Sequence, residues 1–239
     1  MNNSESSPVT HPQAANLVLG IDTCGPSGTV ALGRLTEHAV EILGQIEIEG
    51  RTYSSTLVAT VGDLLAGAGI TVRGLGAIVA VSGPGSFTGV RVGLSAVKGF
   101  AEAADIPVIA VSRLEVLSHK SGLPSAALDA HRHEVFLRVQ GPEGMGELLA
   151  DVQELAAIDP APRQIAVCDD AAAALLKAAW PATEIVQVAA PTAADALESG
   201  AAQVIAGEFV DVALLDAHYL RRSDAEIFGE PAVAEPKLA

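Results

Sequence analysis

The stretch from Ser82 to Asp105 constrains the fold more than any other part of the chain. It follows the apolar run Leu75 to Val81, which predicts a buried strand. Glycine, proline and glycine at positions 83–85 then interrupt regular structure. Ser86 or Thr88 can cap a following helix, because a short hydroxyl side chain accepts a hydrogen bond from a free amide at the helix start. The stretch therefore predicts a strand, a glycine-rich turn and a helix in direct succession.

The predicted helix has three distinct faces at 3.6 residues per turn. One face is polar, one carries the apolar side chains of an ordinary core, and one consists of small residues. Glycine costs about 1 kcal/mol relative to alanine inside a helix, so the small face needs a physical reason. Close approach of another helix is such a reason, and that helix belongs either to this chain or to a partner protein. The polar face is Arg91, Ser95, Lys98, Glu102 and Asp105; the core face is Val90, Leu94, Val97 and Ala101; the small face is Gly89, Val92, Gly93, Ala96, Gly99 and Ala103.

A second helix, predicted over Tyr53 to Ala68, repeats this arrangement. The two small faces either pack on each other or form a flat surface that another protein covers. On the second interpretation, Gly93→Leu is expected to block association and leave the fold intact. The core face of this helix is Leu57, Val61, Leu64, Leu65 and Ala68, and its small face is Ser55, Ala59, Gly62, Ala66 and Gly69.

The composition is that of a globular protein that avoids nucleic acids. Of the 239 residues, 49% are hydrophobic and 18% charged, which is typical of chains that bury a core. A net charge of −15 and a pI near 4.6 disfavour direct binding to nucleic-acid phosphates. Cys24 and Cys168 have no metal-ligand spacing and are expected to be reduced thiols. No signal peptide and no membrane-spanning run is recognisable, so we expect a soluble, cytoplasmic protein.

The order of elements predicts an α/β fold with two related lobes, each a mixed sheet with helices. Three strands come first, over 17–22, 29–35 and 40–49, and helices then alternate with strands. Near residue 125 the chain starts again with a second hairpin, followed by strands over 164–167 and 185–188 and helices over 171–179 and 192–207. We expect a flexible N-terminal extension (1–16), an N-terminal lobe (17–111), a C-terminal lobe (112–222) whose last helix can return to the first lobe, and a flexible tail (223–239).

Asp22 ends the first strand directly before a glycine-rich hairpin. Actin-like ATPases keep a phosphate-loop acid at this place, where a carboxylate organises Mg²⁺; the alternative is an aspartate that caps a turn. The turn from Gly83 to Gly89 can cradle an anion at a helix N-terminus. The candidate nucleotide or phosphate loop is thus Asp22, Thr23, Gly83, Gly85 and Ser86, although the two common phosphate-loop patterns are absent.

His131 and His133 lie two residues apart on a predicted strand edge, close to Asp129. They are either metal ligands or exposed histidines, and no third ligand has suitable spacing. The sequence contains no H-x-x-x-H pattern and no nucleophile elbow around a serine. We therefore predict no catalytic residue and no metal site in this chain.

Several motifs together resemble the bacterial TsaB (YeaZ) family. They are Ile21-Asp22-Thr23, the run from Gly83 to Leu94, Ile109 to Leu114, the hairpin from Asp129 to Phe136, and Tyr219-Leu220-Arg221. The resemblance extends from about Leu17 to Arg221 in the right order. It departs from the family pattern after Arg51, where a histidine is missing, and at His131 and His133, which replace an arginine and a glycine.

The resemblance implies the actin-like ASKHA fold and a non-catalytic subunit of the machinery that installs threonylcarbamoyl on the adenosine beside the anticodon of tRNAs reading ANN codons. The family's partner is TsaD, bound through the N-terminal-lobe helices, and the ATPase TsaE joins the pair. No cofactor of its own is expected, and ATP and magnesium are expected only at the level of the complex. The negative charge suggests that tRNA is contacted indirectly, and the small faces allow a homodimer when the partner is missing. The predicted partner-binding residues are Ser55, Ala59, Gly62, Ala66, Gly89, Val92, Gly93, Ala96, Gly99 and Ala103.

Two enzymatic alternatives stay open from the sequence. An actin-like ATPase or kinase would use Asp22 and the Gly83–Gly89 loop, although the second half shows no equally clear glycine-rich turn. A glycoprotease-type metallopeptidase is less well supported, because the paired histidine ligands are missing.

Overall fold

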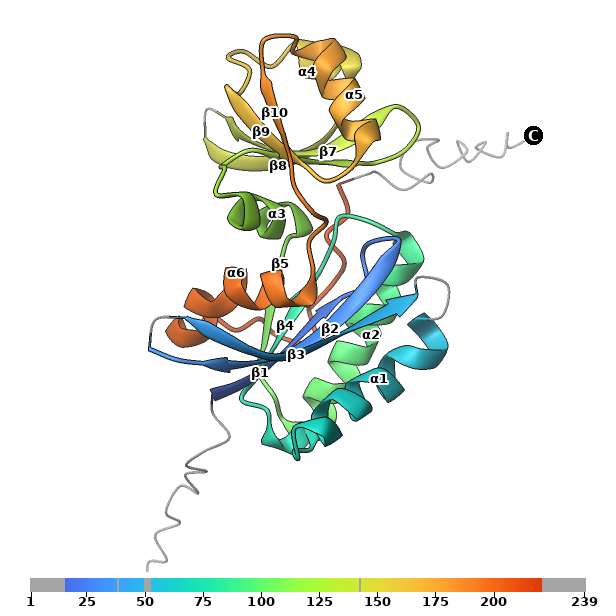
Figure 1. Ribbon diagram of the computed structural model, residues 1–239, viewed down its shortest axis with the longest axis vertical. Helices are drawn as coiled ribbons and strands as arrows, with labels where there is room; N and C mark the ends of the chain where they lie inside the picture. Colours follow the sequence, from blue (N-terminus) through green and yellow to red (C-terminus); the bar gives the residue numbers. More distant parts are fainter. Residues whose placement is uncertain (1–15, 38, 50–52, 142, 221–239) are drawn as a thin grey trace, which may run out of the picture.

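The computed structural model describes residues 16–37, 39–49, 53–141 and 143–220 (Figure 1). The predicted extension 1–16, except for its last residue, and the predicted tail 223–239 lie outside these ranges. None of the helices in the described ranges combines the length and the apolar character needed to cross a membrane.

The first sheet has the strand order β3-β2-β1-β4-β5. β1 (Leu17–Asp22), β2 (Ser27–Leu35) and β3 (Val40–Glu49) form an antiparallel meander, while β4 (Ala77–Val81) and β5 (Val108–Val111) continue the sheet in parallel with β1. β1 and β4 are almost completely buried along their length, because helices cover both faces of the sheet.

The second sheet repeats this topology, with the order β10-β9-β6-β7-β8. β6 (Ala126–Asp129), β7 (Glu134–Gly141) and β8 (Gly144–Asp151) are antiparallel, and β9 (Gln164–Val167) and β10 (Glu184–Gln187) run parallel with β6. The expected restart of the chain near residue 125 is thus a complete structural repeat.

Helices α1 (Tyr53–Gly67) and α2 (Phe87–Ala104) lie side by side on one face of the first sheet (Figure 1). The other face is covered by α6 (Ala193–Ala206), which comes from the end of the chain. The matching helix α3 (Arg113–Ser121) packs on the second sheet and also contacts α6. Helices α4 (Val152–Ala156) and α5 (Asp170–Ala179) complete the second lobe, and a short 3-10 turn, η2 (Val72–Gly74), precedes β4.

The two lobes therefore share helices at their junction. Lys120 of α3 and Asp195 of α6 form an ion pair of 2.7 Å between them. The division into 17–111 and 112–222 separates the two sheets, but α6 belongs by packing to the first sheet. We keep these boundaries as a proposed division by sheet.

The predicted helices and strands are present, and the structure adds a strand and an α-helix that were not predicted. Neither β8 nor α4 was expected: Gly144, Met145 and Gly146 begin β8 without the alternation that marks a half-buried strand, and α4 has only five residues. Ala68, assigned to the core face of α1, is exposed and lies beyond the last helical residue. The other four residues of that face are buried, as are all four of the core face of α2.

Candidate functional site

Two glycines of the predicted partner-binding set are buried inside this chain. A Cβ atom on Gly89 would overlap the backbone oxygen of Thr23, and one on Gly93 would overlap Thr23 Oγ1. The Thr23 hydroxyl also donates a 2.7 Å hydrogen bond to the carbonyl of Gly89. These glycines therefore let α2 approach the end of β1. Their assignment to a partner surface is wrong, and so is the expectation that Gly93→Leu leaves the fold intact.

The rest of the small-residue set is open. On α1, Ser55, Ala59, Gly62 and Ala66 are exposed, and on α2 Gly99 and Ala103 are exposed while Val92 and Ala96 are half-buried. A Cβ atom at Gly62 or Gly99 would meet no described atom within 4 Å. The two helices contact each other; Val92 and Ala96 pack partly against the core of the first lobe, while the other six residues remain exposed. We call these eight residues the small-residue face.

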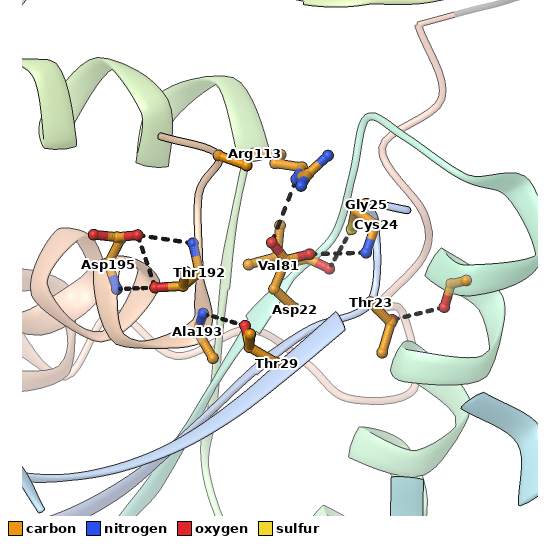
Figure 2. A network of polar contacts seen from close by, with 12 residues as sticks. Asp22, Thr23, Cys24, Gly25, Thr29, Val81, Arg113, Thr192, Ala193 and Asp195 are labelled. Atoms are coloured by element: carbon orange, nitrogen blue, oxygen red, sulfur yellow. Dashed lines mark hydrogen bonds and ion pairs between the residues drawn. The ribbon is translucent and has the colours of Figure 1, made fainter. Parts of the chain in front are cut away.

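The carboxylate of Asp22 is fully engaged within the chain (Figure 2). Asp22 is only 2% exposed. Its Oδ1 accepts a 2.8 Å hydrogen bond from the amide of Cys24, and its Oδ2 lies 3.3 Å from Nε of Arg113. Burial acts to lower the pKa of Arg113, but the charge of Asp22, its hydrogen bond and the contributions of Cys24 and Cys168 together outweigh burial and raise that pKa. The arrangement is a buried ion pair between the end of β1 and the start of α3, and it favours the interpretation of Asp22 as a structural residue.

The other candidate loop residues pack on the same turn. The amide of Ser86 donates to the carbonyl of Cys24 at 2.8 Å, and a Cβ atom on Gly85 would overlap that carbonyl oxygen. The hydroxyl of Ser86 caps α2 by accepting from the amide of Gly89, which confirms one of the two predicted caps. Gly83, with φ of 113°, accepts a hydrogen bond from the amide of Arg113. The structure brings the five residues together, with the two loops in direct contact.

His131 and His133 lie in the turn between β6 and β7 rather than on a strand edge, so that expectation is wrong. With Arg132 they form three successive non-glycine residues of positive φ, at 61°, 54° and 65°. All three are exposed, and Nδ1 of His131 lies 2.8 Å from Asp129 Oδ2. Among the described residues no group of three or more histidine, cysteine, aspartate or glutamate side chains is placed to hold a metal ion.

A second carboxylate, that of the half-buried Glu147 in β8, joins three segments. It accepts hydrogen bonds from Ser112 Oγ at 2.6 Å, from Arg138 at 2.9 Å, and pairs with His218 Nε2 at 2.9 Å. Burial acts to raise the pKa of Glu147, but the hydrogen bonds from His218, Ser112 and Arg138 outweigh it and hold that pKa below its ordinary value. The cluster ties the second sheet to the connection after β5 and to the C-terminal segment.

An aromatic–arginine cluster lies exposed at the start of α2. The guanidinium carbon of Arg91 stacks 3.1 Å from the ring centroid of Phe87 and 5.3 Å from that of Tyr219. Phe87 is 61% exposed and Tyr219 is 46% exposed. The two rings are themselves 5.8 Å apart between centroids. Sequence reasoning placed Arg91 on the polar face of α2 but missed its neighbours.

Sequence reasoning also missed Arg113, Glu147 and His218 as members of polar clusters that join distant segments. Arg113 follows a serine cap at a helix start, where a charged side chain is ordinarily solvated. No periodic pattern marks a residue whose partner lies 91 positions away, as Asp22 does from Arg113. The only available signal was that Arg113 and His218 fall within or beside the motifs that resemble a known family, and Glu147 lies outside those motifs.

Comparison with known proteins identifies the family. The family model described as TsaD, tRNA N6-adenosine threonylcarbamoyltransferase, matches residues 42–164, about half of the chain. An uncharacterized protein of Mycobacterium tuberculosis is 32% identical over 147 residues, covering 61% of this chain and 68% of the relative. Proteins named tRNA threonylcarbamoyladenosine biosynthesis protein TsaB are similar in Bacillus subtilis, 35% identical over 123 residues, and in Escherichia coli, 33% identical over 128 residues.

The chain spans about half the length of these two TsaB proteins, 52% of each, and half of its own length is covered. The solved structure of YeaZ from Pseudomonas aeruginosa is 24% identical and superimposes with a TM-score of 0.67 over 86% of this chain and 100% of that one. This agreement shows the expected two-lobed actin-like fold. Sequence and fold agree that this chain belongs to the TsaB (YeaZ) family, within the wider group of proteins that the TsaD family model describes.

Proposed function

We propose that this chain is a non-catalytic subunit of the complex that installs threonylcarbamoyl on tRNA, and that it acts by forming a heterodimer with TsaD through the small-residue face. The small-residue face of α1 and α2 carries the proposal, because it is the exposed outer surface of two adjacent helices. Positions without a bulky side chain let two helix pairs approach closely, and the resulting contact buries apolar area. Val58, which is 62% exposed, adds a larger apolar side chain beside this face.

The state of Asp22 supports a non-catalytic role. A phosphate-loop acid that organises Mg²⁺ needs free carboxylate oxygens. Here the two oxygens are held by Cys24 and by the buried guanidinium of Arg113, so a metal ion would have to displace that cation. The chemistry is then supplied in trans by TsaD, and any ATP or magnesium acts at the level of the complex with TsaD and TsaE.

The net charge of the chain is consistent with a subunit that does not bind tRNA directly. A net charge of −15 repels tRNA, so the other subunits make the main tRNA contacts. When TsaD is absent, two copies of this chain are expected to associate through the same face, because a two-fold axis pairs one patch with the same patch of a second copy. Homodimer and heterodimer then compete for the same helices.

The test is binding of this chain to TsaD from the same genome, measured by size-exclusion chromatography with light scattering. The variants are Gly62→Leu and Gly99→Leu, since an added side chain at either position meets no described atom within 4 Å of its Cβ. Leucine is also the better helix former, so the isolated variants should fold as well as the wild type. We expect a one-to-one complex with the wild type and loss of that complex with either variant.

Gly146→Leu is the matched control. Gly146 lies in β8 of the second lobe and is exposed, and a Cβ atom added there would meet no described atom within 4 Å, so the same side chain is added far from α1 and α2. This control should bind TsaD like the wild type. The stimulation of tRNA modification by TsaD should follow the same order, with activity lost only in the α1 and α2 variants. A wild-type chain that neither binds nor stimulates TsaD contradicts the proposal.

A further inference from the structure

We infer that the aromatic–arginine cluster of Phe87, Arg91 and Tyr219 binds a carboxylate side chain of the partner protein at the edge of the small-residue face. This inference rests on the proposed function, because it names a chemical group that the partner must contribute. The cluster then contributes a charged contact beside a surface made of small, mostly apolar residues.

The position of Arg91 follows from helix geometry. A Cβ atom on Gly89 would lie 3.2 Å from the Tyr53 ring, so α1 packs on the Gly89 side of α2. Successive residues of a helix are rotated by about 100°, which places Arg91 about 160° from Gly89, on the flank away from α1. Thr88 and Ser95, both exposed, lie between Arg91 and the small-residue face. The exposed surface of α2 is therefore continuous from the guanidinium to that face.

The charge of Arg91 has no acidic partner among the described residues; its interactions are those with the two rings. What distinguishes Arg91 from the other described basic side chains is its stacking on two exposed rings. A guanidinium is a planar fork of donors that matches a carboxylate in two parallel hydrogen bonds. Both rings lie against the guanidinium, and its edge is the part that suits an incoming anionic group.

The cluster also holds the guanidinium in place before binding. Phe87 lies four residues before Arg91, on the same side of the helix. Tyr219 is positioned by its neighbour His218, whose amide donates to Ser82 at 2.8 Å and whose ring pairs with Glu147 at 2.9 Å. A side chain that is already ordered loses less conformational entropy on binding. Exposed tyrosine and arginine side chains with this organisation are typical of the residues that dominate interface energies.

The experiment measures the affinity of this chain for TsaD at low and high salt, in buffer without nucleotide. Arg91→Gln removes the charge and keeps an exposed residue with similar helix propensity, so the fold should be unaffected. We expect at least a tenfold loss of affinity at low salt and a weaker dependence of affinity on salt, because one charge pair is lost. Arg163→Gln, at an exposed arginine before β9, makes the same charge change in the second lobe and should bind within twofold of the wild type.

A second variant identifies the group that faces Arg91. Arg91→Lys introduces an amine, and a carbodiimide joins an amine to an adjacent carboxylate in an amide bond with loss of water to the reagent. Within the heterodimer we expect a link from this amine to one aspartate or glutamate of TsaD, located by mass spectrometry after digestion. Arg91→Gln should give no such link.

The outcomes separate this inference from the proposed function. If the wild-type chain does not bind TsaD, both are overturned. If it binds and Arg91→Gln retains the affinity and salt dependence of the wild type, only the carboxylate contact is overturned. The affinities are therefore measured a second time with ATP and magnesium added. If Arg91→Gln weakens binding only in that second measurement, the carboxylate contact is again overturned, because the anionic group would then be a phosphate.

Discussion

Two chemically identical substitutions in α2 should have opposite effects on stability. Gly93 and Gly99 both lie inside the helix, but a Cβ atom on Gly93 would overlap the Thr23 hydroxyl, while one on Gly99 meets no described atom within 4 Å. We therefore compare Gly93→Ala with Gly99→Ala. Each adds a single methyl group, so the difference between them reports the packing at the end of β1.

The magnitudes follow from the contacts. Alanine is favoured over glycine in a helix by about 0.5–1 kcal/mol, so Gly99→Ala should raise the free energy of unfolding by that amount. For Gly93→Ala the same gain is opposed by overpacking of about 1–3 kcal/mol and by weakening of the 2.7 Å hydrogen bond from Thr23 to Gly89, worth about 1 kcal/mol. The net expectation is a loss of about 1–3 kcal/mol.

Thermal and urea unfolding followed by circular dichroism measure both changes. For a chain of this size 1 kcal/mol corresponds to about 2–4 °C in melting temperature. Gly99→Ala should melt a few degrees above the wild type and Gly93→Ala several degrees below it. Equal stability of the two variants would refute the assignment of Gly93 to the interior. A loss of stability in Gly99→Ala would refute the assignment of Gly99 to an open surface.

Three further predictions concern buried and strained groups. Burial and the charge of Asp22 raise the pKa of Tyr53 from 10.0 to about 12. Neutral Tyr53 therefore stabilises the fold below pH 10, and this contribution is lost between pH 10 and 12. In the variant Tyr219→Phe, Tyr53 is the only tyrosine, and ultraviolet titration should show its ionisation shifted to this higher pH. Glu147→Gln should lower the free energy of unfolding by about 3 kcal/mol at pH 7. Because the pKa of Glu147 is lowered in the fold, the difference in unfolding free energy between this variant and the wild type should shrink as the pH falls below about 4.5, as measured by urea unfolding. His133→Gly should raise the melting temperature, since the residue has a φ of 65° and a left-handed backbone costs a side-chain-bearing residue about 1 kcal/mol.

The sequence predicted the fold well because local patterns decide it. The apolar strands, the Ser86 cap and the periodic core faces of α1 and α2 each act within one element, and the structure contains them. The second lobe was predicted less completely, because β8 is half-exposed and rich in glycine at its start. The topology of the repeat depends on strand pairing between distant segments, and its order became clear only from the structure.

The site was predicted only in part, for a reason visible at Gly89 and Gly93. Helical spacing places both glycines beside Val92 and Ala96, so the pattern assigns all four to one face. The face is in fact divided, because Thr23 from the end of β1 packs against the two glycines and leaves the others outside. Periodicity specifies which residues share a side of a helix, but it does not specify what covers that side.

The structural repeat clarifies the role of Asp22. In both lobes the first strand ends in an aspartate whose Oδ1 accepts a 2.8 Å hydrogen bond from the amide two residues on, that of Cys24 after Asp22 and that of His131 after Asp129. Such a hydrogen bond forms a turn by itself and needs neither metal nor nucleotide. The lobes differ in the second oxygen, which faces the buried Arg113 in one and the exposed His131 in the other. The shared feature is thus turn formation, and the basic side chain beside the second oxygen is what each lobe adds to it.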